Sequence, residues 1–285
     1  MFHAVVDELE PISLAELGSK ALLDRVETKY AMPQAMLPSV LAAIGPHYFV
    51  LEVEGQRLNH YRTLYYDTAD FAMYRRHHVG AGDRYKVRAR QYVESQVAFL
   101  EIKHRTKKKR TVKSRIRTTE LVTHLADGPA GLAAEFVDEH CPYTAEDLAP
   151  RLWNSYTRIT LASKSACERV TLDLDLSFDG AGQRLDLPGI VIAEVKQGAH
   201  AGKSDFVSLM RQRGVRKTGF SKYCLGVSLL HPEVKHNHFR TLQRLVAKIM
   251  SAGGNYGYHR PVSWLSDEFA RGVGDRAWHL LPSPA

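Results

Sequence analysis

Seven short segments of the chain alternate charged residues with apolar or small ones, and most of their charges are basic. The clearest segment, RYKVRAR, begins at Arg84 and carries a cation at every second position. Strict alternation is typical of a β-strand whose two faces meet different surroundings. Like charges that lie opposite one another in a sheet repel. A sheet that gathers these cations on one face therefore requires an anion there, and the alternation predicts a binding surface for phosphate-rich ligands.

The other six segments have shorter patterns: Arg25, Glu27 and Lys29; Glu101, Lys103 and Arg105; Lys113, Arg115 and Arg117; Tyr156 and Arg158; Arg169, Asp173 and Asp175; Glu194 and Lys196. For any single strand the alternative is a polar face that meets water. Across the set arginine recurs, and its planar guanidinium group matches phosphate oxygens. We therefore favour a ligand role for the cations on strands, and a solvated hairpin tip for the TKKKR turn.

The order of the segments predicts an α+β fold with an antiparallel sheet, because most consecutive strands have no helix between them. We expect strands at 25–31, 47–53, 57–66, 83–92, 97–105, 110–118, 151–162, 168–178 and 190–197, and helices at 13–24, 33–44, 68–77, 205–213 and 241–250, with two or three more within 120–148. Roughly eight strands suffice to close a barrel. Such a tunnel would have a basic interior and helices packed outside.

The organisation along the chain suggests three parts. Residues 1–24 contain an N-terminal helix opened by a capping box, 25–230 form the tunnel domain, and 231–285 contain a C-terminal helix and tail. Ser13 and Glu16 provide the capping box, since they stand three residues apart before an apolar run. Beyond Gly253 the chain is rich in Gly and Pro, so we expect a frayed tail.

Composition limits the possible partners and compartments. The 285 residues are 44% hydrophobic and carry a net charge of +8, which favours a polyanion such as nucleic acid, an anionic membrane or polyphosphate. Three cysteines without a CxxC pair predict neither a zinc ribbon nor a disulfide framework, and they fit a reducing cytoplasm. The N-terminus does not read as a secretory signal, and no long apolar run predicts a membrane segment.

Familiar catalytic motifs are missing from the sequence. The segment GAHAGKS resembles a P-loop, but it has three residues between its glycines where the motif requires four. We therefore expect a glycine-rich turn into a helix. The histidines match neither HExxH nor a zinc-finger spacing, and GxSxG is absent. Covalent catalysis thus has no support in the sequence.

Carboxylates on the basic faces offer two interpretations. Glu27, Glu101 and Glu194 each precede a lysine by two residues on the same expected face. One interpretation is an internal ion pair that neutralises a buried cation. The other is a divalent metal held between carboxylate and phosphate oxygens. Glu194 is the best metal candidate, because its neighbours are apolar and it lies near the end of a strand.

Together these segments make the chain resemble the catalytic domain of the vacuolar transporter chaperone (VTC) family. The members of that family are polyphosphate polymerases within the triphosphate tunnel metalloenzyme (CYTH-like) superfamily. The matching pieces occur in family order from about Arg25 to Gly226: RVETKY, YRTLYYDTADFAMY, YKVRAR, FLEIKHR, VKSRIR, SYTRI, RVTLDLDLSF, IVIAEVK and FSKY. The ordered set is far more specific than any one piece.

The resemblance implies a basic β-tunnel that binds the triphosphate of ATP and transfers its terminal phosphoryl group to a growing polyphosphate chain. It implies that phosphates are held by Lys29, Arg88, Arg90, Lys103, Lys113, Arg158 and Lys222. Further substrate contacts are expected from Arg25, Lys86, Arg115, Tyr156, Lys196 and Ser221. The metal, Mn²⁺ or Mg²⁺, would bind Glu194, with Glu27 and Glu101 as additional candidates. Tyr65 and Asp67 belong to the motif without an assigned role.

Two other functions remain open at the level of sequence. Water in place of the acceptor chain would make the same tunnel an inorganic or nucleoside triphosphatase. A non-catalytic module that binds polyphosphate or RNA is the second alternative. RNA binding usually exposes aromatic residues for base stacking, whereas Tyr85 alternates away from the basic face. We therefore expect ATP and polyphosphate as partners, no nucleic acid, a cytoplasmic location and an undetermined oligomeric state.

Overall fold

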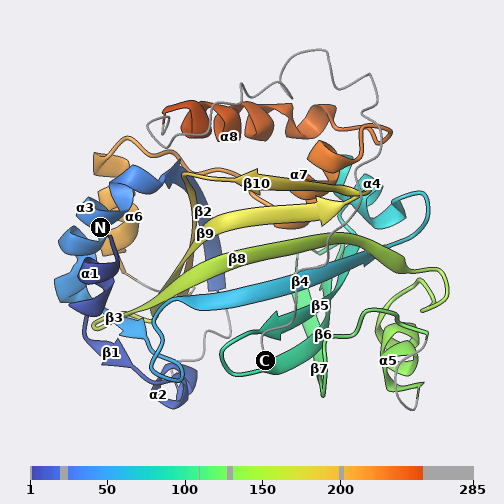
Figure 1. The fold of residues 1–285 in the computed structure, drawn as a ribbon, viewed down its shortest axis with the longest axis horizontal. Coiled ribbons are helices and arrows are strands. Elements are labelled where there is room, and N and C mark those ends of the chain that lie inside the picture. Colours follow the sequence, from blue (N-terminus) through green and yellow to red (C-terminus); the bar gives the residue numbers. More distant parts are fainter. Residues whose placement is uncertain (1, 20–24, 109, 127–130, 199–201, 253–285) are drawn as a thin grey trace.

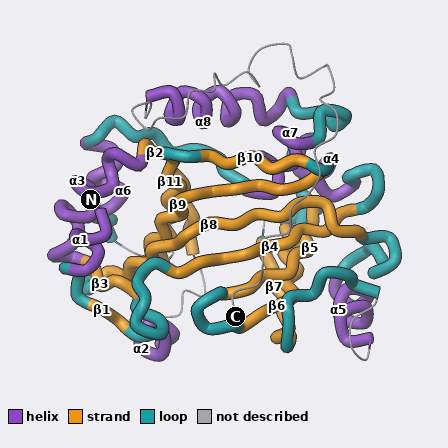
Figure 2. The backbone as a smooth tube through the Cα atoms, in the orientation of Figure 1, coloured by secondary structure: helices purple, strands orange, loops and turns teal. Residues whose placement is uncertain are grey.

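A single large sheet dominates the structure, a computed structural model that describes residues 2–19, 25–108, 110–126, 131–198 and 202–252. The sheet has 11 strands (Figure 2). Its main path runs in the order β2 (Arg25–Pro33), β11 (Ile190–Gly198), β9 (Glu168–Gly180), β8 (Ala149–Ser163), β4 (Asn59–Asp67), β5 (Arg84–Tyr92), β6 (Val97–Arg105) and β7 (Thr111–Thr118). Every neighbouring pair on this path is antiparallel.

Three short strands extend the sheet beside the main path. Strand β10 (Gln183–Leu187) pairs with β9, and β3 (Tyr48–Leu51) pairs with β8, both antiparallel. Strand β1 (Pro11–Ile12) runs parallel to β3. In Figure 1 the two ends of the sheet bend toward the same side, behind β4, β8 and β9. The predicted α+β class with an antiparallel sheet is confirmed, and this curvature gives the sheet one concave and one convex face.

Helices cover the convex face, as alternation predicts for the apolar sides of the strands. Helices α1 (Phe2–Asp7), α3 (Leu37–Ile44) and α6 (Asp205–Gln212) pack with inward-facing residues of β2, β8, β9 and β11 in one apolar cluster. Helix α5 (Leu132–His140) covers β4, β5 and β6 in another cluster. Helices α2 (Leu14–Ser19) and α4 (Ala72–His78) lie in the connections before β2 and after β4. The arrangement of helices outside a charged sheet is confirmed.

Helix α7 (Lys222–Leu230) packs on the opposite, concave face. Its apolar residues share a cluster with Tyr65 and Tyr156 of that face. Gly226 permits this close approach, since a Cβ there would come within 2.6 Å of the Leu152 side chain and 2.7 Å of the Phe178 ring. Helix α8 (Arg240–Ala252) follows α7 and packs against β2 and β11, with its apolar residues in the same cluster. One end of the concave face is therefore filled by α7 and α8, and the remainder carries the charges.

Local sequence signals explain several helix starts. The predicted capping box is present: the Ser13 backbone N–H donates to Glu16 Oε2 at 2.9 Å, and Glu16 N–H donates to Ser13 Oγ at 3.3 Å. Ser204 caps α6 by accepting from Val207 N–H at 3.0 Å. Ser221 caps α7 in the same way from Cys224 N–H at 3.2 Å. The GAHAGKS segment therefore ends in a helix cap, although its residues 199–201 lie outside the described chain.

The sheet differs from the prediction in its closure. The hydrogen-bonded path ends at β2 and β7, so the described strands form an open, curled sheet and not a closed barrel. The outer edge of β2 instead pairs with the segment before α7: Tyr30 forms a bridge with Lys217, and Thr218 N–H donates to Lys29 O at 2.8 Å. The edge of β2 is thus covered locally by a short extended segment.

Element boundaries follow the prediction in most places. Exceptions are the described part of 120–148, which contains one α-helix in place of two or three, and the elements α1, β1, β10 and α7, which were not predicted. The predicted helix 13–24 ends at Ser19 in the structure, with 20–24 outside the described residues. The expected frayed tail beyond Gly253 also lies outside them. The division of the chain into three parts stays a prediction.

Candidate anion-binding site

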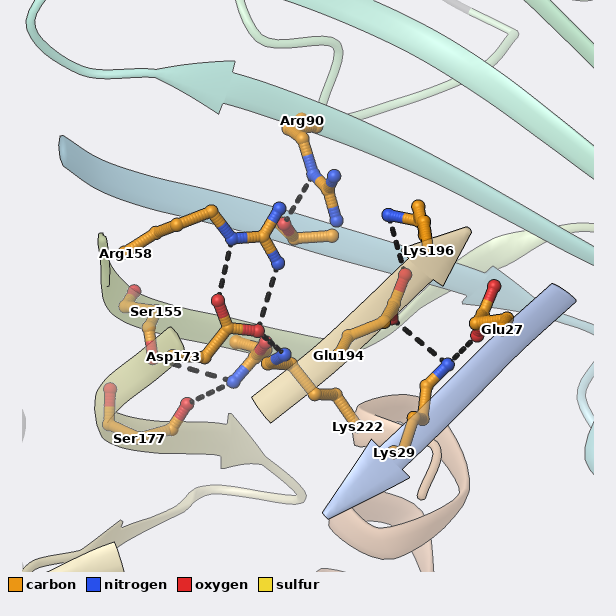
Figure 3. A network of polar contacts seen from close by, with 12 residues as sticks. Glu27, Lys29, Arg90, Ser155, Arg158, Asp173, Ser177, Glu194, Lys196 and Lys222 are labelled. Carbon is orange, nitrogen blue, oxygen red and sulfur yellow. Dashed lines mark hydrogen bonds and ion pairs between the residues drawn. The ribbon is translucent and has the colours of Figure 1, made fainter. Parts of the chain in front are cut away.

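Cross-strand register gathers the predicted cations on the concave face. Lys86 of β5 lies opposite Lys103 of β6, and Lys103 lies opposite Lys113 of β7. On the other half of the sheet, Arg158 lies opposite Asp173 and Lys29 opposite Glu194. Figure 3 shows that the side chains of these last four residues converge from different strands. Alternation in the sequence therefore did identify one shared face.

Asp173 forms the first cluster on this face and is 2% exposed. Arg158 donates to both its carboxylate oxygens, from Nε at 2.6 Å and from Nη2 at 2.9 Å (Figure 3). Lys222, the first residue of α7, pairs with Asp173 Oδ2. Burial alone would raise the pKa of Asp173, but Arg158 and Lys222 outweigh it and lower the pKa to about 2. One carboxylate thus fixes two cations from different elements.

Glu194 forms a second cluster with cations from β2 and β11. Its Oε2 lies 3.0 Å from Lys29 Nζ, and its Oε1 lies 2.5 Å from Lys196 Nζ. Lys29 also contacts Glu27, so four side chains form one chain of ion pairs (Figure 3). Burial opposes ionisation of Glu194, but Lys196 and Lys29 hold its pKa well below the usual range. The predicted metal candidates Glu194 and Glu27 therefore lie together, joined through a lysine.

Glu101 forms a third cluster on β6 and is 1% exposed. Arg88 Nη2 lies 2.7 Å from Glu101 Oε2, and Lys113 pairs with Oε1. Burial raises the pKa of Glu101 and the cations Arg88, Arg90 and Lys113 lower it, with a net decrease. The sequence spacing suggested Lys103 as the partner of Glu101, whereas these two cations from neighbouring strands take that place.

Several cations of the face have no carboxylate partner among the described residues. Lys86 Nζ donates to Ser221 Oγ at 2.9 Å, and Arg90 Nε donates to Thr63 Oγ1 at 3.3 Å. The Lys103 side chain is exposed on the concave face. Desolvation of its ammonium group and the nearby cations Lys86, Lys29 and Arg88 lower its pKa to about 7. The face therefore carries excess positive charge, and its most direct neutralisation is a bound anion.

Aromatic rings support the arginines at the centre of the face. Tyr156 stacks on Tyr61 with ring centroids 5.1 Å apart. The guanidinium of Arg158 lies 4.9 Å from the Tyr61 ring, and Lys222 Nζ lies 4.4 Å from the Tyr156 ring. The Tyr156 hydroxyl is buried without a hydrogen-bond partner in the described part of the protein. That hydroxyl therefore has an unused hydrogen-bonding capacity, and a contact between Tyr156 and substrate stays a prediction.

The remaining predicted residues lie at the margins. Arg115 is exposed on the edge strand β7, with its guanidinium 4.8 Å from the Phe99 ring. Arg25 is the first residue of β2, and its side chain lies outside the described atoms. Ser221 caps α7 and accepts from Lys86, so it lies at the junction of the helix and the cationic row.

Sequence reasoning missed Asp173 as a site residue and left Tyr65 and Asp67 without roles. Asp173 could have been found, because it belongs to an alternating segment and β9 neighbours β8. Tyr65 accepts from Arg88 Nη1 at 3.5 Å, on the concave face. Asp67 is fully buried and accepts from the Met73 and Tyr74 N–H groups, each at 2.9 Å, and from the Tyr223 hydroxyl. Asp67 therefore joins α4 to α7 through hydrogen bonds, which is a structural role.

A profile of the VTC domain matches residues 24–231. The chain belongs to the VTC domain family. The resemblance drawn from the ordered motifs is thereby confirmed, and family membership together with the cationic face supports a function on polyphosphate or triphosphate. No curated protein matches this VTC domain.

Solved structures with a similar fold differ widely in sequence from this VTC domain. A candidate adenylate cyclase from Bacillus halodurans is 13% identical, with a TM-score of 0.46 over 70% of this chain and 94% of its own. A candidate adenylyl cyclase from Hippeastrum, described as having dominant triphosphatase activity, is 15% identical, with a TM-score of 0.44 over 74% of this chain and 100% of its own. None of the described helices is both long and apolar enough to cross a bilayer.

The donor set of this VTC domain fits a metal that arrives with its substrate. The described residues contain no cluster of three or more His, Cys, Asp or Glu side chains able to hold an ion unaided. Glu194 and Glu27 nevertheless present hard carboxylate oxygens on the concave face, and Mg²⁺-like ions commonly combine one or two carboxylates with phosphate oxygens. Glu101 is held by Arg88 and Lys113, and its metal role stays a prediction.

Proposed function

We propose that this VTC domain is a metal-dependent polyphosphate polymerase that uses ATP as phosphoryl donor. The observation that carries the proposal is the excess of cations on one concave face, several of them buried or half-buried. They come from β2, β5, β6, β7, β8, β11 and α7 and include Arg88, Arg90, Arg158 and Lys222. A ligand that neutralises so many cations at once must be a polyanion, and family membership selects polyphosphate or triphosphate among polyanions.

The arginines and Lys222 would bind the transferring phosphoryl group. Phosphoryl transfer demands in-line positioning and neutralisation of charge on the phosphate oxygens. Arg158 and Lys222 are fixed by Asp173, and Arg88 is fixed by Glu101, so their donors are oriented before substrate binds. Preorganised donors of this kind stabilise developing charge without reorganisation during the reaction. Arg90, which has no carboxylate partner among the described residues, is free to bind phosphate directly.

Glu194 and Glu27 would hold the divalent ion, Mn²⁺ or Mg²⁺, beside the phosphates. When bound, such an ion supplies Lewis-acid polarisation of a phosphoryl oxygen. Lys29 and Lys196 now neutralise these carboxylates, and in the complex both lysines would turn to phosphate oxygens. These four residues would therefore pair with one another before substrate binds, and would contact the metal and the phosphates afterwards.

The acceptor would be a terminal phosphate oxygen of the polyphosphate chain. That oxygen attacks the γ-phosphorus of ATP, the bond from this phosphorus to the β,γ-bridging oxygen breaks, and ADP leaves. Because the attacking oxygen is already ionised, the reaction requires no general base. Water in place of this oxygen would give a triphosphatase on the same face, so the identity of the acceptor separates the two activities.

The experiment is to incubate the purified chain with ATP and Mn²⁺ and to separate the products on a gel stained for polyphosphate. A ladder or smear that disappears with chelator is expected. Orthophosphate without a ladder would replace the proposal by a triphosphatase. No product at all, with retained polyphosphate binding, would replace it by a non-catalytic binding module.

Glu194→Gln provides the matched test of the metal site. The amide keeps the size of the side chain but removes the charge, so we expect loss of metal-dependent turnover in a protein that still unfolds cooperatively. Its melting temperature should fall, because the ion pairs with Lys29 and Lys196 are lost. Glu135→Gln, an exposed carboxylate on the convex helix α5, is the control and should leave turnover unchanged. Normal turnover of Glu194→Gln would exclude Glu194 from the metal site.

A further inference from the structure

A cavity of about 1060 Å³ opens beside the cationic face. Its lining comes from the start of β5, the end of β6, the start of β7, the segment before α7, and the turn and helix that contain His238 and Thr241. Lys86 and Ser221 lie in the lining and join the two sides by their hydrogen bond. The proposed function gives no role to most of the residues of this cavity.

One wall of the cavity is basic and continues the cationic rows outward. Arg84 lies opposite Arg105, one row beyond the pair Lys86 and Lys103. Successive rows are two residues apart, which is roughly 7 Å along a strand. Neither Arg84 nor Arg105 has a carboxylate partner among the residues that the structure describes. A chain of phosphates could therefore follow these rows from Arg84 toward Arg88, and the acid of the lining, Glu27, belongs to β2.

The opposite wall is aromatic and apolar. Phe239 is partly buried, with its ring 5.6 Å from Tyr74 and 5.3 Å from His238, which is itself exposed. Phe220 and Leu242 complete this side. His77, also in the lining, adds no positive charge, because burial and the cations Lys86, Arg84 and Lys103 lower its pKa to about 2. The wall therefore presents aromatic rings and apolar side chains to the cavity.

We propose that this cavity holds the nucleoside of ATP, with the base against Phe239 and His238 and the phosphates directed inward past Lys86. This assignment rests on the proposed function and extends it. A ligand that uses both walls must combine a polyanion with a flat ring, as a nucleoside triphosphate does. A bare polyphosphate would use the basic wall alone. The cavity thus distinguishes a nucleotide donor from inorganic triphosphate.

The test compares ATP with inorganic tripolyphosphate as probes in calorimetric titrations of the full chain. For Phe239→Leu we expect at least about fivefold weaker ATP binding, the scale of one lost stacking contact, with tripolyphosphate affinity changed by less than about twofold. His238→Ala, at an exposed position, should give a smaller loss in the same direction. Retained tripolyphosphate affinity would itself show that the variants fold.

Phe2→Leu is the matched control, since Phe2 is a partly buried phenylalanine on α1 outside the cavity. It should change neither affinity. Equal losses of ATP and tripolyphosphate in Phe239→Leu, or no loss of either, would overturn the nucleoside assignment and leave the polymerase proposal standing. Absence of tripolyphosphate binding by the wild-type protein would instead refute the proposed function itself.

Discussion

Three carboxylates of the concave face each hold two cations, in the groups Asp173 with Arg158 and Lys222, Glu194 with Lys29 and Lys196, and Glu101 with Arg88 and Lys113. The Asp173 and Glu101 groups are therefore net positive before any ligand binds, whereas Glu27 balances the charge of the Glu194 group. A face with equal numbers of acids and cations would not attract anions, and on a face without acids the cations would repel one another. The observed carboxylates orient the cations, and the cations in excess of them can still bind phosphate.

The contribution of the Asp173 group to the stability of the fold can be measured. Its pKa falls from 3.8 to about 2 in the folded protein. A depressed carboxyl pKa adds stability above the unfolded value, and that stability is lost as pH falls from about 4 toward 2. The shift corresponds to about 2 kcal/mol. We expect Asp173→Asn to be destabilised by about this amount at neutral pH, with the difference shrinking below about pH 4.

Urea unfolding of the wild type and Asp173→Asn from about pH 7 to about pH 3 measures this difference. Asp175→Asn is the control, because Asp175 lies two residues further along β9 and is exposed. It should differ little from the wild type at any pH. A constant difference between Asp173→Asn and the wild type across this range would contradict the ionised state of Asp173.

Among individual residues, the sequence predicted the cations of the site better than it predicted their carboxylate partners. Alternating Arg and Lys identified Arg88, Arg90 and Lys103 because a strand places every second side chain on one face. The partners of those cations depend on which strands are neighbours, and that information is not local. Glu101 therefore pairs with Arg88 and Lys113 and not with the nearby Lys103 that spacing suggested.

Helix α7 is the element that completes the site. Its N-terminal turn supplies Lys222 and Ser221, and Tyr223 joins it to Asp67. Its position depends on Gly226, where the helix meets the side chains of Leu152 and Phe178. A displacement of α7 would therefore move two groups of the proposed site, Lys222 and Ser221, at once.

Gly226→Ala tests this dependence. The added Cβ would come within 2.6 Å of Leu152 and 2.7 Å of Phe178, so α7 must shift. We expect a loss of about 1–3 kcal/mol in the free energy of unfolding, the usual range for overpacking, and weaker tripolyphosphate binding. Urea unfolding and calorimetry measure the two effects.

Gly18→Ala is the helical control, because a Cβ at Gly18 in α2 meets nothing within 4 Å. Alanine favours helix over glycine, so stability should stay equal or rise by roughly 0.5–1 kcal/mol. Unchanged stability and binding in Gly226→Ala would show that α7 tolerates a shift without effect on the site.

Elements with strong periodicity were predictable and irregular ones were not. Strands β5 and β6 match their predicted ranges within one residue, since their alternation is strict. Strand β10 was missed because its pairing with β9 follows a tight turn through Ala181 and Gly182, both with positive φ. The register of β8 and β9 shifts between Ser155 and Thr157, and an irregularity of this kind cannot be read from alternation.

On the scale of the whole molecule, one curled sheet separates two environments. Helices α1, α3, α5 and α6 with two apolar clusters occupy the convex side, while the charges, α7 and α8 occupy the concave side. The predicted closure into a barrel is replaced by an open path whose β2 edge pairs with the segment before α7. Strand number alone allowed closure, but edge pairing is decided by chain segments far apart in the sequence.

The measurement that tests the central claim most directly is calorimetric titration of inorganic tripolyphosphate into the wild type and Arg88→Ala/Arg90→Ala. Charge-assisted hydrogen bonds contribute about 1.5–3 kcal/mol each, so the double variant should bind at least about 100-fold more weakly. Arg90→Ala alone leaves every ion pair of the three carboxylate groups in place and should show part of the affinity loss. Its melting temperature should fall less than that of the double variant, because only the contacts with Thr63 and Tyr61 are lost.

Arg62→Ala is the control, because Arg62 lies on β4 with its guanidinium 5.3 Å from the Trp153 ring and is exposed. Its tripolyphosphate affinity should equal that of the wild type. A strong loss confined to the Arg88 and Arg90 variants is the result that we predict. Equal affinity in all the variants would mean that the concave face is merely solvated and would contradict the account.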